Sequence, residues 1–206
     1  MTARGTYHHG DLRHALVVSG LELLDSEGLA AVTLRAVARH AGVSHSAPYH
    51  HFEDKDALVA ALAERAADQL VDELRASMAT ATSLPQAARS LGVAYVRYAV
   101  THPERFRLLS RRRSPSSSSR SPEAKLAETS SVALLVLLKA IRLGQSTGAV
   151  IDDSPERLAL TAWSSLHGVA TLLLDGLLTD GPPTVEEAER IAESATRILL
   201  QGMLSR

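Results

Sequence analysis

Apolar side chains recur at intervals of three and four residues along most of this chain, and no segment alternates convincingly between apolar and polar positions. Because such spacing gathers apolar side chains on one face of an α-helix, the pattern predicts an all-α fold. The first helix begins near Asp11 and ends at Gly28. Its predicted buried face consists of Leu12, Leu16, Gly20, Leu23 and Leu24.

Two short helices and one long helix are predicted next. Thr33 caps the second helix, and Gly42 marks its end. Ser44 caps a third helix, expected from His45 to about His51, and a fourth begins near Asp54. The fourth helix is long, and its apolar positions are Leu58, Leu62, Ala66, Leu70 and Leu74.

Prolines divide the rest of the chain into about five further helices, because proline is tolerated at a helix start and not in a helix interior. The total is about nine helices. The length of 206 residues corresponds to roughly 1.4 domains of average size. We therefore expect an amino-terminal domain over residues 1–70 and a second helical domain over residues 71–206, joined by the long fourth helix.

Composition removes several classes of chemistry. The chain contains no cysteine, which excludes disulfides, thiol nucleophiles and cysteine-ligated metals. The longest apolar run, Val132 to Leu138, is much shorter than the roughly 20 residues of a membrane span. We expect a cytoplasmic protein with no membrane partner and no cofactor.

The most specific pattern is TLRAVARHAGVSHSAPYHHF, from Thr33 to Phe52. Two short helices that meet at a steep angle need a small residue at their contact, a glycine in the turn and an apolar side chain after it. Ala38, Gly42 and Val43 occur at this spacing, which is typical of a DNA-binding helix-turn-helix. The second short helix would then enter the major groove. Its exposed residues are His45, Ser46, Ala47, Tyr49 and His50.

This segment resembles the DNA-binding domain of the TetR family of transcriptional regulators. The resemblance covers residues 4–62. It rests on Tyr7-His-His-Gly-Asp-Leu-Arg13, Ala41-Gly-Val-Ser44, Ala47-Pro48-Tyr49, His51-Phe52, Lys55 and Leu58. That opening, together with Trp163 and His167-Gly168, is similar to the subgroup named for a Trp-His-Gly motif. The resemblance implies a homodimeric repressor that binds double-stranded operator DNA and leaves it when a small molecule binds.

The same resemblance implies roles for individual residues. Thr33, Tyr49 and Lys55 would hold phosphates, and Arg4 would act as a flexible arm. His45, Ser46, Ala47 and His50 are the candidates for contacts to bases or the groove. The complete expected DNA-binding set is Thr33, Arg35, Ser44, His45, Ser46, Ala47, Tyr49, His50 and Lys55.

The charge of this region is unusual for a DNA-binding segment. Residues 1–60 contain five Lys or Arg and seven Asp or Glu, a balance of minus two. Such a domain must concentrate its cations on one face and use neutral donors, helix amino-termini or protonated histidines. Seven of the nine histidines lie in the first 51 residues.

A helix-turn-helix protein usually binds DNA as a two-fold symmetric dimer. The partner places a second recognition helix about 34 to 36 Å away or at a multiple of that distance. We expect the dimer interface in the last two helices, where an apolar stripe and two glycines occur. The expected residues are Gly168, Gly176, Ala188, Ile191, Ala192, Ala195, Ile198 and Leu199. The alternative is that this stripe packs only within its own chain.

The second domain is built mostly of Leu, Val and Ala, and its few aromatic and imidazole groups are candidates for a ligand site. The expected effector-binding residues are Tyr95, Tyr98, Phe106, Trp163 and His167. The apolar surroundings favour a lipophilic effector with one or two polar groups. The alternative for Trp163 and His167 is structural packing alone.

Other interpretations stay open. The histidines near positions 8–14 and 50–51 could bind a metal, although no further ligands complete a tetrahedral set. The chain could also be a small-molecule-binding protein with a vestigial helix-turn-helix. Ser164 and Ser165 lie near His167, but no nucleophile elbow or glycine-rich phosphate loop accompanies them, so we expect no enzyme. The Ser- and Arg-rich segment 111–122 is either a solvated loop or an anion-binding or modified site.

Overall fold

The computed structural model describes residues 9–110 and 132–204, which form eight α-helices and one 3₁₀ helix with no strand among them. The all-α prediction is confirmed. The helices are α1 (His9–Glu27), α2 (Leu34–His40), the 3₁₀ helix η1 (Ala47–His50), α3 (Lys55–Met78), α4 (Leu84–Thr101), α5 (Pro103–Ser110), α7 (Val132–Ser146), α8 (Pro155–Leu174) and α9 (Val185–Met203).

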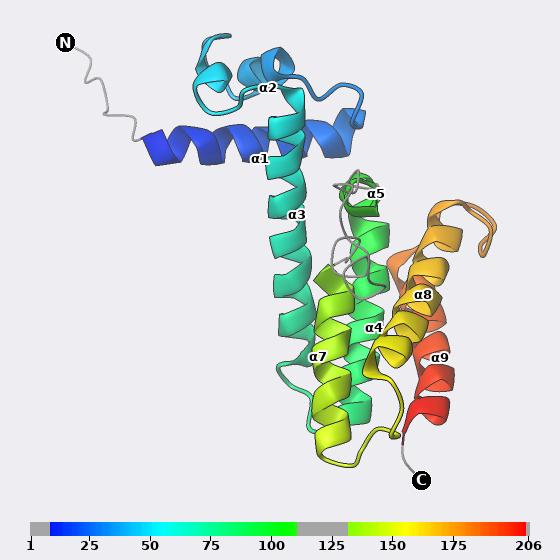
Figure 1. Ribbon diagram of the computed structural model, residues 1–206. Helices are drawn as coiled ribbons and strands as arrows, with labels where there is room; N and C mark the ends of the chain where they lie inside the picture. Colours follow the sequence, from blue (N-terminus) through cyan, green and yellow to red (C-terminus); the bar gives the residue numbers. More distant parts are fainter. Residues whose placement is uncertain (1–8, 111–131, 205–206) are drawn as a thin grey trace.

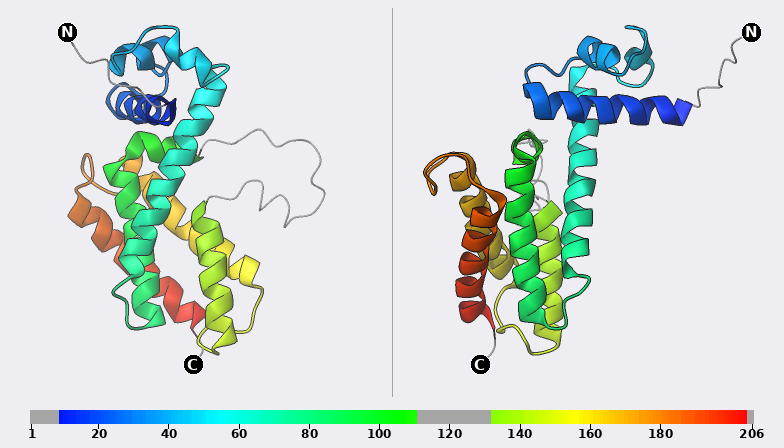
Figure 2. Two further views of the ribbon diagram at one scale, coloured as in Figure 1. Left: turned by 90° about the vertical axis from the view of Figure 1, so that its left-hand side faces the viewer. Right: turned by 180° about the vertical axis from the view of Figure 1, so that it is seen from behind.

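The helices divide into two groups that share α3 (Figure 1). The elements α1, α2 and η1 gather around the first turns of α3, which α1 crosses. The rest of α3 runs beside α4 and α7, while α8 and α9 lie on the side of the bundle away from α3 (Figures 1 and 2). The long helix therefore connects the amino-terminal group to the bundle.

Local chemistry explains where the first helices begin and end. Gly28 follows α1 with φ +77, a conformation that costs glycine little. Thr33 caps α2 by accepting a hydrogen bond from Ala36 N at 3.1 Å, and Asp54 caps α3 in the same way through Ala57 N at 2.8 Å. The predicted starts of these two helices are confirmed.

Two hydrophobic cores meet along α3. The first four buried positions of α3, among them Leu58 and Ala66, pack with α1 and α2. The next two, Leu70 and Leu74, pack with α4, α8 and α9. The division between the cores thus falls near the expected domain boundary, inside a continuous helix.

The bundle is closed by a tight crossing of α4 and α9. Gly92 is the point of closest approach, because a methyl group there would collide with the hydroxyl of Thr196. Thr196 is buried, and its hydroxyl donates to the carbonyl of Ala192 at 2.8 Å. A side chain at position 92 would have to displace this buried hydroxyl, so the crossing favours glycine there.

The short helix α5 contacts both groups of helices. Phe106 is buried in the bundle core, and Leu108 is buried in the amino-terminal core. Arg105 donates to both carboxylate oxygens of Asp25 on α1 and, at 2.7 Å, to Gln69 on α3. Eight residues of helix therefore fix the position of α1 relative to the bundle.

Replacing Gly92 with alanine should lower the free energy of unfolding by about 1–3 kcal/mol, because overpacking outweighs the better helix propensity of alanine. Gly202 of α9 provides the control, since a methyl group there meets no neighbour within 4 Å. Gly202→Ala should be neutral or stabilising by up to about 1 kcal/mol. Denaturant unfolding of both variants measures the difference, and equal stabilities would contradict the proposed constraint.

Candidate functional site

The segment from α2 to η1 has the geometry of a helix-turn-helix. Gly42 has φ +68, and no atom lies within 4 Å of a methyl group placed there, so glycine is needed for its backbone conformation rather than for space. Val43 N donates to Ala38 O at 3.0 Å, which closes the turn. Ala38 is fully buried at the contact.

The third helix is shorter than the sequence predicted. It is a single 3₁₀ turn, Ala47–His50, in place of a helix from His45 to about His51. Pro48 has no N–H and lies at the start of this turn, so the backbone cannot form a regular α-helical ladder there. The predicted cap is also wrong, because the Ser44 hydroxyl lies 3.2 Å from that of Ser46 and caps no helix.

The expected DNA-binding residues occupy one end of the molecule. All of them are exposed except Ala47, which is half-buried: Thr33, Arg35, Ser44, His45, Ser46, Tyr49, His50 and Lys55. The ring of Tyr49 is 52% exposed although its neighbour Pro48 is buried. Lys55 Nζ lies 3.5 Å from the carbonyl of Leu29, next to the loop that precedes α2. Exposed hydroxyl, imidazole and cationic groups are thus grouped around η1 and the start of α2.

An ion pair with α5 offsets one negative charge of the amino-terminal domain. Asp25 is paired with Arg105, which belongs to α5 and lies outside residues 1–60. The imidazole of His40 contacts the carboxylate of Glu22 at 3.1 Å and ties α2 to α1. The simple charge count of the domain therefore overstates its repulsion for a polyanion.

Four of the predicted effector-binding residues form one aromatic cluster. The Trp163 and His167 rings are stacked with centroids 5.0 Å apart, and Phe106 lies 5.2 Å from His167. Tyr95 Oη and His167 Nδ1 share a hydrogen bond of 2.9 Å. Burial lowers the pKa of His167, so the folded protein favours the neutral imidazole.

Tyr98 has a different position. It is fully buried, and its hydroxyl donates to the carbonyl of Ala66 on α3 at 3.0 Å. Burial raises the pKa of Tyr98 to about 12. Its contacts are those of a core residue that fastens α4 to α3, which differs from the predicted role in an effector site.

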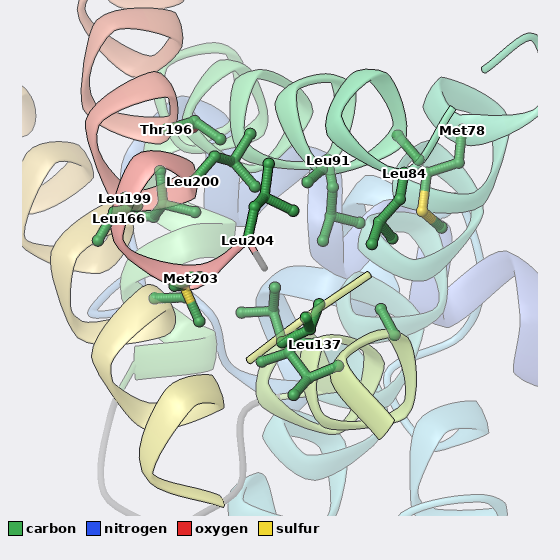
Figure 3. A pocket seen from close by; sticks show the side chains of 16 residues that line it. Met78, Leu84, Leu91, Leu137, Leu166, Thr196, Leu199, Leu200, Met203 and Leu204 are labelled. Atoms are coloured by element: carbon green, nitrogen blue, oxygen red, sulfur yellow. The ribbon is translucent and has the colours of Figure 1, made fainter. Parts of the chain in front are cut away.

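An apolar cavity lies beside the aromatic cluster, where no sequence motif pointed to it. It has a volume of about 90 Å³ and is lined by residues of α4, α7, α8 and α9 and by Met78 at the end of α3 (Figure 3). Aliphatic side chains such as Leu84, Leu137, Leu199 and Met203 surround it. Of the predicted effector-binding residues, Trp163 and Tyr95 line only a smaller adjoining hollow. A cavity lined by leucine and alanine has no residue signature in the sequence, because its walls resemble any core.

The residues expected at the dimer interface are divided between the core and the surface. Ala188 and Ala192 are fully buried within the chain, so their assignment to an interface is wrong. Ile191 and Leu199 also pack against the bundle core, so four of the six apolar stripe residues of α9 face the interior. Other positions stay accessible: Ile198 is 62% exposed, and Gly168 has open space beside it. Ala195 is half-buried.

Two further expectations are affected by the structure. Gly176 does not belong to α8, which ends at Leu174, and instead forms the turn after it with φ +69. Arg4 and the Ser- and Arg-rich segment 111–122 lie outside the described residues.

The described residues contain neither a metal-binding cluster nor a membrane-spanning helix. Across residues 9–110 and 132–204, no group of three or more His, Asp or Glu side chains is arranged to hold a metal ion. No helix in the same part of the chain combines the length and the apolar character needed to cross a membrane.

Two family models match the chain. The model described as "Bacterial regulatory proteins, tetR family" matches residues 16–62, and the model described as "Tetracyclin repressor-like, C-terminal domain" matches residues 88–199. The tetracycline repressor protein class C of Escherichia coli is 44% identical over 52 residues, which cover 25% of this chain and 24% of that protein. The chain thus matches about a quarter of the length of this curated relative.

Solved structures extend the similarity to nearly the whole chain. A protein of unknown function from Rhodococcus sp. RHA1 has a TM-score of 0.79 and 29% identity, over 98% of this chain and 100% of that one. A TetR-family transcriptional regulator from Pectobacterium atrosepticum has a TM-score of 0.70 and 22% identity, over 97% and 99% of the two chains. A TetR family transcription regulator from Marinobacter aquaeolei VT8 has a TM-score of 0.66 and 21% identity, over 95% and 96%. The two regulators show a common fold.

The neutral, buried imidazole of His167 predicts a pH-dependent stability. Because burial lowers its pKa, the unfolded chain takes up a proton near pH 6.5 while the folded chain does not, so stability falls as the pH drops below about 6.5. His167→Asn cannot titrate and keeps a polar group near Tyr95. Wild type should therefore lose stability relative to this variant between about pH 7.5 and 5 in thermal unfolding. Parallel profiles for the two proteins would contradict a neutral His167.

Proposed function

This chain belongs to the TetR family of bacterial transcription regulators, and on that premise we propose that it is a homodimeric repressor acting on DNA in the cytoplasm. Its operator is released when a small lipophilic effector binds in the bundle. One observation carries the proposal: α2, η1 and the start of α3 gather at one end of the molecule (Figure 1), and Thr33, Tyr49 and Lys55 in these segments are all exposed. These groups suit phosphate contacts on both sides of a major groove.

Base recognition is assigned to the side chains that precede and follow the short 3₁₀ turn. His45 and His50 are exposed, and an imidazole can donate to or accept from base edges. Ser46 can do the same through its hydroxyl. The single turn of η1 places few side chains in the groove, so the phosphate contacts supply a large share of the affinity.

The proposed dimer interface uses the outer faces of α8 and α9. Leu160, Gly168 and Leu172 recur at multiples of four residues along α8, so they share one helix face, and both leucines are 40% exposed. Ile198 is exposed on α9. The row between the two leucines contains only the small residues Ser164 and Gly168, which allow two helices to approach closely, and a second copy of the chain would cover it.

We assign the link between effector and DNA to α5. Phe106 contacts the aromatic cluster at Tyr95, with ring centroids 5.6 Å apart, while Arg105 holds Asp25 of α1. A ligand changes DNA affinity only by stabilising one arrangement of the two DNA-binding domains over another. A displacement of α5 by a bound effector would move α1 and with it the helix-turn-helix.

The Trp163, His167 and Gly168 positions also support the subgroup with a Trp-His-Gly motif. Trp163 and His167 stack on one face of α8, and Gly168 follows on the open side. We assign the first two residues to the interior and the glycine to the dimer interface.

Substitutions of contact residues test the DNA-binding surface. The operator is first selected from a random pool of duplexes and should be two-fold symmetric. Lys55→Ala should weaken binding to operator and scrambled DNA alike and reduce the salt slope by about one, while Tyr49→Phe should weaken both without changing the slope. His45→Ala should also relax the preference at one base position, by about 1–3 kcal/mol.

Lys139 provides the matched control, because it is an exposed lysine on α7, far from η1. Lys139→Ala changes net charge by the same amount and should leave DNA binding nearly intact. If Lys55→Ala and Lys139→Ala behave alike in titrations across salt concentrations, Lys55 contacts no phosphate.

A charge on the outer face of α9 tests the dimer. Ile198→Glu would bury two unpaired carboxylates in a symmetric interface, so dimerisation should weaken by roughly 100-fold or more and operator binding should be lost. Leu143→Glu on α7 is the control, because Leu143 is similarly exposed, at 66%. Sedimentation of both variants decides the matter. If the Ile198→Glu variant remains dimeric, the dimer interface lies on another face of the protein.

A further inference from the structure

Two hollows lie side by side inside the bundle and share a wall. The larger, about 90 Å³, is the cavity of Figure 3. The smaller, about 10 Å³, is lined by Trp163 and Tyr95. Leu91, Leu137 and Leu166 line both hollows. Rotation of these leucine side chains would therefore join the two hollows into one elongated site.

The walls of the joined site exclude ions. No charged side chain lines either hollow in the described part of the chain. The hydroxyl of Thr196 borders the larger hollow, but its proton is already donated to Ala192 O. An ionised ligand would lose its hydration there and gain no partner, which is strongly unfavourable. The site therefore selects neutral molecules.

The indole N–H of Trp163, a residue that lines the smaller hollow, lacks a hydrogen-bond partner among the described residues. Within residues 9–110 and 132–204, Trp163 Nε1 is the buried side-chain polar atom that makes no hydrogen bond. An indole N–H only donates, so the group that completes it must be an acceptor. The neighbouring Tyr95 and His167 are hydrogen-bonded to each other. A buried donor left in this state costs free energy that a suitable ligand would recover.

We propose that the effector is a small neutral molecule with a hydrocarbon body in the larger hollow and one acceptor oxygen, of the carbonyl or ether type, bonded to Trp163 Nε1. This inference rests on the proposed function, because it assigns a chemical class to the effector of that site. Met78 and Met203 border the cavity, and their flexible side chains allow it to adapt to ligands of different shape.

The size of the cavity limits the ligand. A volume of about 90 Å³ is smaller than the ~150 Å³ of an engineered cavity that holds benzene. A six-membered ring therefore fits only if the shared leucine wall opens. Opening that wall joins the larger hollow to the one that Trp163 lines, so a ligand with an acceptor oxygen can then reach the indole N–H.

Three ring compounds of matched shape serve as probes: cyclohexanone, methylcyclohexane and cyclohexylammonium. Each is titrated into the full chain, with binding heats and thermal unfolding as readouts. Cyclohexanone and methylcyclohexane should bind and raise the unfolding temperature, and the cation should do neither. Trp163→Phe should weaken cyclohexanone about tenfold and leave methylcyclohexane nearly unchanged, which also shows that the variant is folded.

Filling the cavity provides a second variant. Ala162 lines the larger hollow, so Ala162→Leu should abolish binding of both neutral probes. Ala88→Leu, at another point of the same wall, repeats the test if the first variant unfolds. Ala30 is exposed in the loop before α2, and Ala30→Leu should bind the probes like wild type.

Several results would overturn the inference: binding of the cation, no binding of either neutral probe, or equal effects of Trp163→Phe on the ketone and the alkane. Operator binding without any probe is measured on the same proteins. A wild type that recognises an operator but binds no neutral probe refutes only the ligand class. A wild type that binds the ketone but selects no operator refutes the proposed repressor function instead.

Discussion

The arrangement of the two domains depends on the hydrogen bonds that the Arg105 guanidinium makes to Asp25 and Gln69. Its Nε and Nη2 donate to the carboxylate of Asp25, and its Nη1 donates to Gln69. Two sides of the planar guanidinium are therefore hydrogen-bonded. Arg105 is largely buried. A buried cation that lost its carboxylate would be strongly destabilising, whereas the intact pair fixes one geometry. The carboxyl end of α1 is therefore held against α5 and α3, and the amino-terminal domain cannot turn freely on the long helix.

The position of α5 follows from the residues on either side of Arg105. Phe106 packs into the bundle core and Leu108 into the amino-terminal core, so successive side chains of one short helix face different parts of the molecule. Pro103 begins the helix, with only His102 between it and the end of α4 at Thr101. In the proposed mechanism α5 acts as a rigid connector, because both its faces are packed and neither can move without displacing a partner.

Local features of this fold could be predicted from sequence, and features made by distant residues could not. Thr33 and Gly42 act within a few residues of themselves, so their cap and turn were recognisable. The pairing of Arg105 with Asp25 joins positions 80 residues apart and leaves no local pattern. The apolar stripe of α9 was recognised, but its periodicity does not distinguish contact with α4 from contact with a second chain, and Ala192 belongs to the first. The cavity could not be predicted from the sequence, because its position depends on how helices that are distant in the chain pack against one another.

The two faces of α9 connect the cavity with the proposed dimer. Leu199 and Met203 border the cavity, while Ile198 is exposed on the other side of the helix. At the edge of the cavity that Thr196 borders, Gly92 leaves no space for a side chain between α4 and α9. If a ligand enlarged the cavity, α9 could not move closer to α4 at this contact, so a displacement of α9 would turn the helix about Gly92. In the proposed dimer paired through α9, such a turn would rotate one protomer against its partner and would change the distance between the two DNA-binding domains.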